Sequence, residues 1–227
     1  MLAIAARTIL AAAAALTAML AAAGEPVLLF NGKNFDGWVT TDGKPVNDGW
    51  EVVDGVIHLK SQKARAGSIR TTRTFDSFEL EFEWRVAPGG NSGVKYMARE
   101  LDSPFGRHFL GCEYQLLDDA GHTNGRTPLT TAGSLYGLYP PDSAQKHLRP
   151  LGEFNQARIV VDHGRIEHWL NGKRIVAAVI GSEDWEKRFA ETKLAGVTGF
   201  ARAPGVILLQ EHLSEAWFRN LRLTPLP

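Results

Sequence analysis

The stretch Phe78-Glu79-Leu80-Glu81-Phe82-Glu83-Trp84-Arg85-Val86 decides the fold class of this chain. Apolar and polar side chains alternate strictly along it, which is typical of a β-strand with one buried face. Pro88-Gly89-Gly90-Asn91 follows and supplies residues that favour the backbone conformations of a reverse turn. The stretch therefore predicts a strand at residues 78–86 and a chain reversal directly after it.

Two further strands are predicted beyond this turn, at residues 92–100 and 111–117. Side chains alternate between the two faces of a strand, so Glu113 and Gln115 share one face. The opposite face carries the other side chains of that strand, Cys112, Tyr114 and Leu116. We predict that the strands at 78–86, 92–100 and 111–117 contribute to one polar groove, which suits a sugar-like ligand.

Turn signals recur along the rest of the chain, as at Asp54-Gly55, His163-Gly164 and Asn171-Gly172. They separate short apolar runs that we expect to be strands, at residues 28–30, 50–59, 69–72, 157–162, 165–170, 173–180, 205–212 and 217–223. One helix is predicted, at residues 184–192, and the Gly- and Pro-rich segment 121–152 is expected to be a functional loop. Many short strands with almost no helix predict an all-β sandwich.

The N-terminal residues 1–23 differ in composition from the rest of the chain. Arg7 precedes an apolar, Ala-rich run that ends in Ala21-Ala22-Ala23, which is the pattern of a signal peptide with a small-residue cleavage site. A retained membrane anchor is disfavoured, because the run at 8–23 is short for a span of about 20 residues. We therefore expect a signal peptide at 1–23, one domain at 24–227, export to the periplasm or beyond, and no stable membrane insertion after cleavage.

Composition excludes other classes of protein. Twenty-five basic and 25 acidic residues balance to zero, without a basic block, which argues against nucleic acid or an anionic membrane as a partner. Cys112 is the only cysteine, so no internal disulfide forms. Its neighbours Gly111 and Glu113 include no group that would activate a thiolate nucleophile, so we expect Cys112 to be a small core residue.

Several short motifs together resemble one family. They are Leu29-Phe30-Asn31-Gly32-Lys33 with Gly37-Trp38, Asn91-Ser92-Gly93-Val94-Lys95-Tyr96, Glu113-Tyr114-Gln115-Leu116-Leu117-Asp118-Asp119, Gly133-Ser134-Leu135-Tyr136 and Trp217-Phe218-Arg219-Asn220-Leu221. In this order the chain resembles the 3-keto-disaccharide hydrolase domain family over residues 27–224. The resemblance implies a concanavalin A-like jelly-roll sandwich of two antiparallel sheets in an exported bacterial protein. It also implies substrates that are glycosides already oxidised to a ketone at sugar C3.

The chain departs from the pattern of that family at two places. Where the family often has His-Pro-Asp, this chain has His122-Thr123-Asn124, so a carboxylate is missing. Where the family usually has Gln-Asp-His-Gly, this chain has Gln210-Glu211-His212-Leu213. Glu211 keeps the charge, whereas Leu213 in place of Gly puts the following turn in doubt.

The residue inventory disfavours an ordinary retaining glycosidase. Such an enzyme needs two carboxylates about 5–5.5 Å apart, and the pattern Glu113-x-Gln115-x-Leu117 carries one carboxylate at three positions. A 3-keto substrate needs less, because the ketone acidifies the C2 proton and the resulting enolate expels the C1 substituent by β-elimination. One base near neutral pKa is then sufficient, with donors or a metal at the developing oxyanion.

We predict that His212 and Glu113 are catalytic. His212 is the first choice for proton transfer at C2, because an unperturbed imidazole titrates near ~6.5; the alternative, with Glu113 as the base and His212 as a donor to the enolate, stays open. Substrate binding is predicted for the polar residues Asn91, Gln115, Asp118, His122, Tyr136 and Gln210. Asp118 with Asp119 suits the capping of a turn equally well. The remaining histidines are expected at the surface or in turns: His58, His108, His147, His163 and His168.

Two questions stay open at this stage, the cofactor and the class of activity. A divalent cation held by Glu113, His122 or His212 with a carboxylate is one option, since imidazole and carboxylate suit transition metals, but no ligand spacing is diagnostic. Cleavage of a 3-keto-glycoside or 3-keto-disaccharide by elimination and hydration is the predicted function, with an oligosaccharide or glycoside as the substrate partner. The alternative is a non-catalytic carbohydrate-binding module, since one fold supports many functions.

Overall fold

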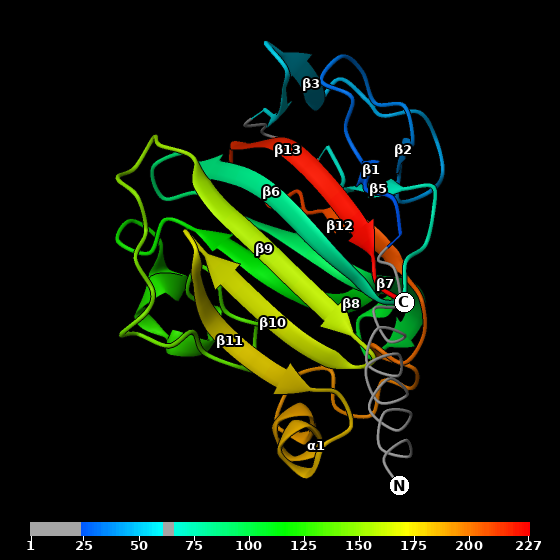
Figure 1. The fold of residues 1–227 in the computed structure, drawn as a ribbon, viewed down its shortest axis with the longest axis vertical. Helices are drawn as coiled ribbons and strands as arrows, with labels where there is room; N and C mark the ends of the chain where they lie inside the picture. The colour runs from blue at the N-terminus through cyan, green and yellow to red at the C-terminus, as the bar shows by residue number, and fades with distance from the viewer. Residues whose placement is uncertain (1–23, 61–65) are drawn as a thin grey trace, which may run out of the picture.

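The computed structural model describes residues 24–60 and 66–227, so the expected signal peptide lies outside the described residues. Two antiparallel sheets face each other in a jelly-roll sandwich (Figure 1), which confirms the predicted fold class. Within the described part of the chain, no helix is both long and apolar enough to cross a bilayer.

The larger sheet has eight strands in the order β11-β10-β9-β6-β13-β4-β3, with β1 paired to β13. Their bounds are β1 Val27–Leu28, β3 Trp50–Val53, β4 Val56–Leu59, β6 Phe78–Val86, β9 Asn155–Asp162, β10 Arg165–Leu170, β11 Lys173–Val179 and β13 Ala216–Pro225. The meander β9-β10-β11 turns at His163-Gly164 and Asn171-Gly172, as predicted from its turn residues.

The smaller sheet has five strands in the order β2-β5-β12-β7-β8. Their bounds are β2 Trp38–Thr40, β5 Ile69–Thr71, β7 Asn91–Ser103, β8 Gly106–Leu117 and β12 Val206–Leu209. Helix α1 spans Glu183–Ala190. Ser182 caps its N-terminus, because the Ser182 side chain accepts a hydrogen bond from Trp185 N. The loop between β8 and β9 contains two short 3₁₀ helices, η1 (Thr123–Arg126) and η2 (Pro128–Thr130).

The prediction that three consecutive strands form one groove is wrong for the first of them. β6 belongs to the larger sheet, where it pairs with β9 and β13, while β7 and β8 pair with each other in the smaller sheet. The turn after β6 therefore carries the chain from one sheet to the other. Alternation in a sequence identifies the buried face of a strand but not the strand that pairs with it. The pattern at residues 78–86 therefore fits a strand in either sheet.

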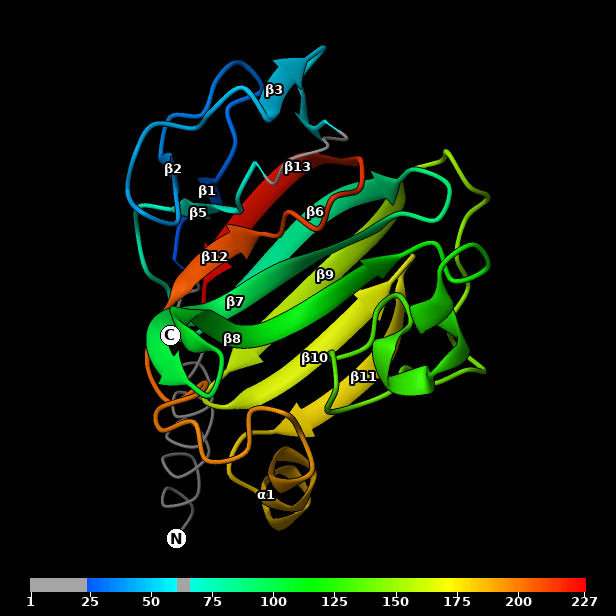
Figure 2. The same ribbon diagram turned by 180° about the vertical axis from the view of Figure 1, so that it is seen from behind.

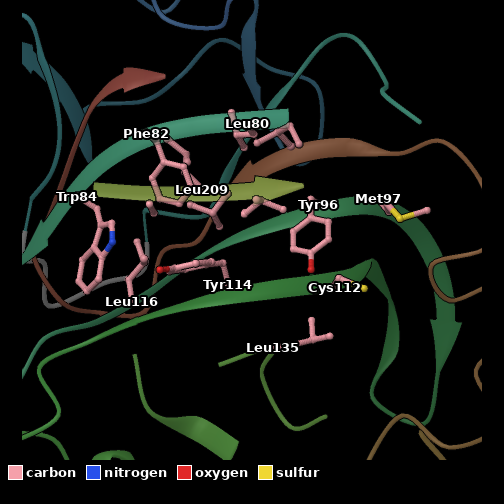
Figure 3. Close-up of a cluster of buried hydrophobic side chains, with 14 of the residues drawn as sticks. Leu80, Phe82, Trp84, Tyr96, Met97, Cys112, Tyr114, Leu116, Leu135 and Leu209 are labelled. Carbon is pink, nitrogen blue, oxygen red and sulfur yellow. The ribbon is translucent and has the colours of Figure 1, made fainter. Parts of the chain in front are cut away.

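The core lies between the two sheets (Figure 3). β6 contributes Leu80, Phe82 and Trp84, and the smaller sheet contributes buried side chains that include Tyr96, Cys112, Tyr114 and Leu116. Cys112 is a buried free thiol, as predicted, and burial raises its pKa to about 12. The core therefore takes the inner face of β8, which leaves Glu113 and Gln115 on its outer face.

His168 on β10 was predicted at the surface, and the structure corrects this, because its side chain is fully buried. Its Nδ1 lies 3.0 Å from the carbonyl oxygen of Gly133, which only accepts, so Nδ1 carries the proton. Its Nε2 then accepts from the Tyr96 hydroxyl at 2.8 Å. Burial lowers the pKa of His168 to about 4, so the neutral imidazole links the two sheets and the loop 121–152.

Candidate active site

A pocket of about 510 Å³ lies on the outer face of the smaller sheet, over β7 and β8. Residues of these two strands make its floor, and its walls come from the loop 121–152, from α1 and the segment after it, and from the residues that follow β12. Figure 2 shows the loop and α1 beyond the β8 edge of the smaller sheet. The long irregular loop predicted to be functional thus supplies part of the pocket wall, including Tyr136.

Glu113 lies in the floor of the pocket. It is paired with Lys95 in the β7–β8 register, and Lys95 Nζ lies 3.8 Å from Glu113 Oε2. The Glu113 side chain is 11% exposed. Burial raises the pKa of Glu113, and the positive charges of Lys95, Lys193 and His212 oppose that rise. The site therefore holds a carboxylate that is more basic than an exposed one.

Gly93 brings the Glu113 carboxylate close to the backbone of β7. A Cβ atom built on Gly93 would lie 2.5 Å from Glu113 Oε1, far inside contact distance. The absence of a side chain at residue 93 is therefore what allows the carboxylate to lie flat across the neighbouring strand.

Three amide side chains line one end of the pocket. Gln115 Nε2 donates to Asn91 Oδ1 at 3.1 Å. The remaining acceptors, Gln115 Oε1 and Gln210 Oε1, are buried and have no hydrogen-bond partner among the described residues. Buried acceptors without partners are costly, so these two oxygens point to a ligand that donates hydrogen bonds, as sugar hydroxyls do.

Tyr136 and Lys193 stand beside Glu113 on the wall of the pocket. Tyr136 N donates to the Glu113 carbonyl oxygen at 3.0 Å, which holds this part of the loop against β8. Burial and the Glu113 charge raise the pKa of Tyr136, so its hydroxyl stays protonated and serves as a donor. Lys193 Nζ lies 5.5 Å from the centre of the Tyr136 ring.

The profile of the 3-keto-alpha-glucoside-1,2-lyase-like domain family matches residues 25–224 of this chain. The chain belongs to this family. A relative named 3-keto-disaccharide hydrolase, from Bacteroides thetaiotaomicron, is 30% identical over 225 residues, which cover 87% of this chain and 77% of the relative. The family resemblance found in the sequence is thereby confirmed, and it places the chain among carbohydrate-acting hydrolases.

Solved structures agree with this assignment. A candidate glycosyl hydrolase from Parabacteroides distasonis superposes with a TM-score of 0.77 at 30% identity, covering 89% of this chain and 94% of that one. A second candidate glycosyl hydrolase from the same organism has a TM-score of 0.67 at 24% identity, covering 89% and 100%. At that identity the second similarity shows the fold alone.

The pocket brings together six of the eight predicted site residues: Asn91, Glu113, Gln115, Tyr136, Gln210 and His212. Gln210 is half-buried, and His212 is exposed at the rim. In the keto-sugar family pattern a glycine follows this histidine, and here Leu213 adopts the left-handed conformation with φ of 60°. Glu211 Oε1 accepts from Leu213 N at 2.6 Å, so the turn that was in doubt is formed.

The other two predicted residues, Asp118 and His122, lie outside this pocket. Asp118 Oδ2 accepts from Gly89 N at 2.7 Å, and its Oδ1 accepts from Ala120 N and Gly121 N. His122 Nδ1 accepts from Asn124 N at 3.0 Å and thereby begins η1. Asp118 thus bonds to the backbone of the turn after β6 and of the loop, and His122 bonds to the backbone of the loop.

Three further residues line the pocket that were not predicted from the sequence: Lys95, Lys193 and His108. The position of Lys95 was predictable, because Asn91, Gly93 and Lys95 alternate along one strand and so share a face. No sequence pattern indicated Lys193, since it reaches the pocket from the irregular segment after α1. His108 was expected at the surface, and it lines the outer part of the pocket.

The described residues contain no group of three or more His, Cys, Asp or Glu side chains that could hold a metal ion. Of the three cation ligands considered from the sequence, the pocket contains Glu113 and His212, whereas His122 lies elsewhere.

Proposed function

We propose that this chain is an exported enzyme that cleaves the glycosidic bond of 3-keto-glycosides, by elimination across C1 and C2 and then hydration. The observation that carries the proposal is the enclosed Glu113 carboxylate of raised pKa, placed between a lysine and unpartnered amide oxygens on one sheet face. A base of this kind beside sugar-binding groups suits proton abstraction next to a ketone. Export rests on residues 1–23 alone, and an intact mass of exported protein that includes Met1 would contradict it.

Glu113 removes the C2 proton in the proposed first step. The electron pair of the C2–H bond moves into the C3 carbonyl and forms an enolate, whose negative charge Lys95 and the Tyr136 hydroxyl stabilise. Re-formation of the ketone then expels the C1 substituent, which leaves with the bonding pair and takes up a proton. Water adds across the C1–C2 double bond, with hydroxyl at C1 and hydrogen at C2, so the products are the free 3-keto sugar and the alcohol.

The structure favours Glu113 over His212 as the base in this proposal. A base must reach a proton on a bound sugar, and Glu113 lies on the pocket floor, whereas the imidazole of His212 is exposed at the rim. Burial raises the pKa of Glu113, which makes this carboxylate a stronger base than an exposed one. His212 then acts as a nearby charge or donor.

The direct test compares a glucoside with its 3-keto derivative. We expect turnover of the 3-keto-glucoside, a primary kinetic isotope effect when its C2 carries deuterium, and an unsaturated ketone visible by ultraviolet absorbance. The unoxidised glucoside should remain intact. Hydrolysis of the unoxidised glucoside at a similar rate would show an ordinary glycosidase, and binding without turnover of either compound would show a carbohydrate-binding module.

Gly93→Ala tests the placement of the base. The new methyl group would meet Glu113 Oε1, and the carboxylate would swing away because it is the free end of a flexible side chain. We expect the melting temperature to change little and kcat on the 3-keto-glucoside to fall by roughly 10²-fold, the usual consequence of misplacing a reacting group by about 1 Å. An unchanged kcat in a correctly folded variant would show that the position of this carboxylate is not critical.

A further inference from the structure

The pocket has two chemically different ends. At one end, the side-chain oxygens of Gln115 and Gln210 have no hydrogen-bond donor among the described residues. The wall of the other end is apolar and comes from three separate parts of the chain, the β7–β8 hairpin, the loop 121–152 and the segment around α1. Its members are Phe105, Leu110, Leu138, Phe189, Leu194 and Phe200.

Strand register fixes the order of these two ends around Glu113. At about 3.3 Å per residue along β8, Gln115 lies roughly 7 Å from Glu113 toward one end of the strand. Leu110 lies roughly 10 Å away toward the other end, with its side chain on the opposite face of this edge strand, next to Cys112, and both of these residues border the pocket. Gln210 N donates to Gly93 O at 2.8 Å, which places the amides at the Gln115 end. A Cβ atom on Gly199 would lie 3.8 Å from Leu101 Cδ2, which places the neighbouring Phe200 at the hairpin end.

Several polar atoms at the apolar end are already engaged within the protein. His108 Nδ1 lies 3.0 Å from Gly106 O. Thr192 Oγ1 donates to Phe189 O at 2.8 Å and accepts from Leu194 N at 3.1 Å. Phe189 and Phe200 stack with ring centres 5.1 Å apart, while Phe105 at the hairpin tip is 65% exposed. A second sugar placed here would find few free partners for its hydroxyls.

We propose that the apolar end is a leaving-group subsite, and that the preferred substrates are 3-keto-glycosides of alcohols that carry an apolar ring or chain. This inference rests on the proposed function, because elimination requires C2 of the sugar at Glu113 and hence the sugar ring toward Gln115. The C1 substituent then extends toward Phe105 and Leu194. Burial of its apolar surface there supplies binding energy that a sugar leaving group, with its hydroxyls, lacks.

The test uses the 3-keto derivatives of methyl glucoside, 2-phenylethyl glucoside and a glucose disaccharide. Methoxide and 2-phenylethoxide are both unactivated primary leaving groups, so a difference between them reports binding rather than intrinsic reactivity. We expect kcat/KM for the phenylethyl compound to exceed that for the methyl compound by roughly 10- to 100-fold, and also to exceed that for the disaccharide. Phe105→Ala and Leu194→Ala should each lower the phenylethyl-to-methyl ratio several-fold. The matched control Leu151→Ser, at an exposed leucine outside the pocket, should leave it unchanged.

Calorimetry with the two unoxidised glucosides separates this inference from the proposed function. Tighter binding of 2-phenylethyl glucoside than of methyl glucoside supports the subsite if the difference disappears in Phe105→Ala. This holds even if no keto-sugar is turned over, a result that would contradict only the proposed reaction. Equal binding of the two glucosides overturns the subsite, as does equal or better turnover of the disaccharide, and either result leaves the elimination chemistry standing.

Discussion

Glu113→Gln should lower kcat on a 3-keto-glucoside by roughly 10²- to 10⁴-fold, the usual effect of removing a general base. The same substitution should make the protein more stable at neutral pH. Burial raises the pKa of Glu113, so ionising this carboxyl costs the folded state free energy that the unfolded chain does not lose. An amide of the same shape removes that penalty. We therefore expect the melting temperature to rise.

Two controls make this result specific. The stability gain should shrink as the pH falls, because the unmutated Glu113 is then protonated in both states and resembles the amide. His212→Ala should retain kcat within about tenfold, since His212 lies at the rim of the pocket. A large loss in His212→Ala together with a small loss in Glu113→Gln would return the role of base to the histidine.

His168 should make the free energy of unfolding strongly dependent on pH. Its pKa is lowered from 6.5 to about 4 in the folded protein, so between these values the unfolded chain binds a proton that the folded protein does not. The contribution of the neutral His168 to the free energy of unfolding is fully present above about pH 6.5 and is lost as the pH falls toward 4. The loss amounts to about 3 kcal/mol, at 1.36 kcal/mol per pKa unit.

Urea unfolding of the unmutated protein and of His168→Gln across pH 4–7 checks this expectation. The glutamine side chain keeps hydrogen-bonding groups but does not titrate. The variant should be less stable at pH 7 and should show a shallower pH profile. His163→Gln is the matched control, because that histidine is 73% exposed and pairs with Asp162 at the surface. Parallel profiles for His168→Gln and the unmutated protein would remove His168 as the source of the acid sensitivity.

His168 also shows where sequence reasoning failed. It alternates with Ile166 and Leu170 on β10, and all three face the core. The period of the strand therefore indicated burial, while the polarity of imidazole suggested the surface. Burial is tolerated because Tyr96 and Gly133, 72 and 35 residues away, satisfy both ring nitrogens. The pattern of residues around His168 cannot indicate hydrogen-bond partners that are so distant in the sequence.

The candidate site was predictable to the extent that it lies on strands. Glu113 and Gln115 share a face of β8 through alternation, whereas Gln210 and His212 follow the end of β12 at Leu209, beyond the part of the predicted strand 205–212 that forms; the structure places all four in one pocket. Asp118 and His122 belong to an irregular loop, where side chains bond to nearby backbone and neither period nor polarity reveals their direction. The separation of β6 from β7 was equally hidden, because a turn sequence does not specify the sheet that receives the next strand.

The position of β13 in the larger sheet has a consequence for how the chain folds. β13 lies between β6 and β4 and also pairs with β1, so a strand from the end of the sequence joins partners from its beginning. Contacts between residues so far apart in sequence make folding slow. Until residues 216–225 are available, β4 and β6 keep open hydrogen-bonding edges, which are templates for aggregation. In a growing chain β13 is therefore made after every strand that it pairs with, and removal of this one strand would separate β6 from β4 and divide the sheet.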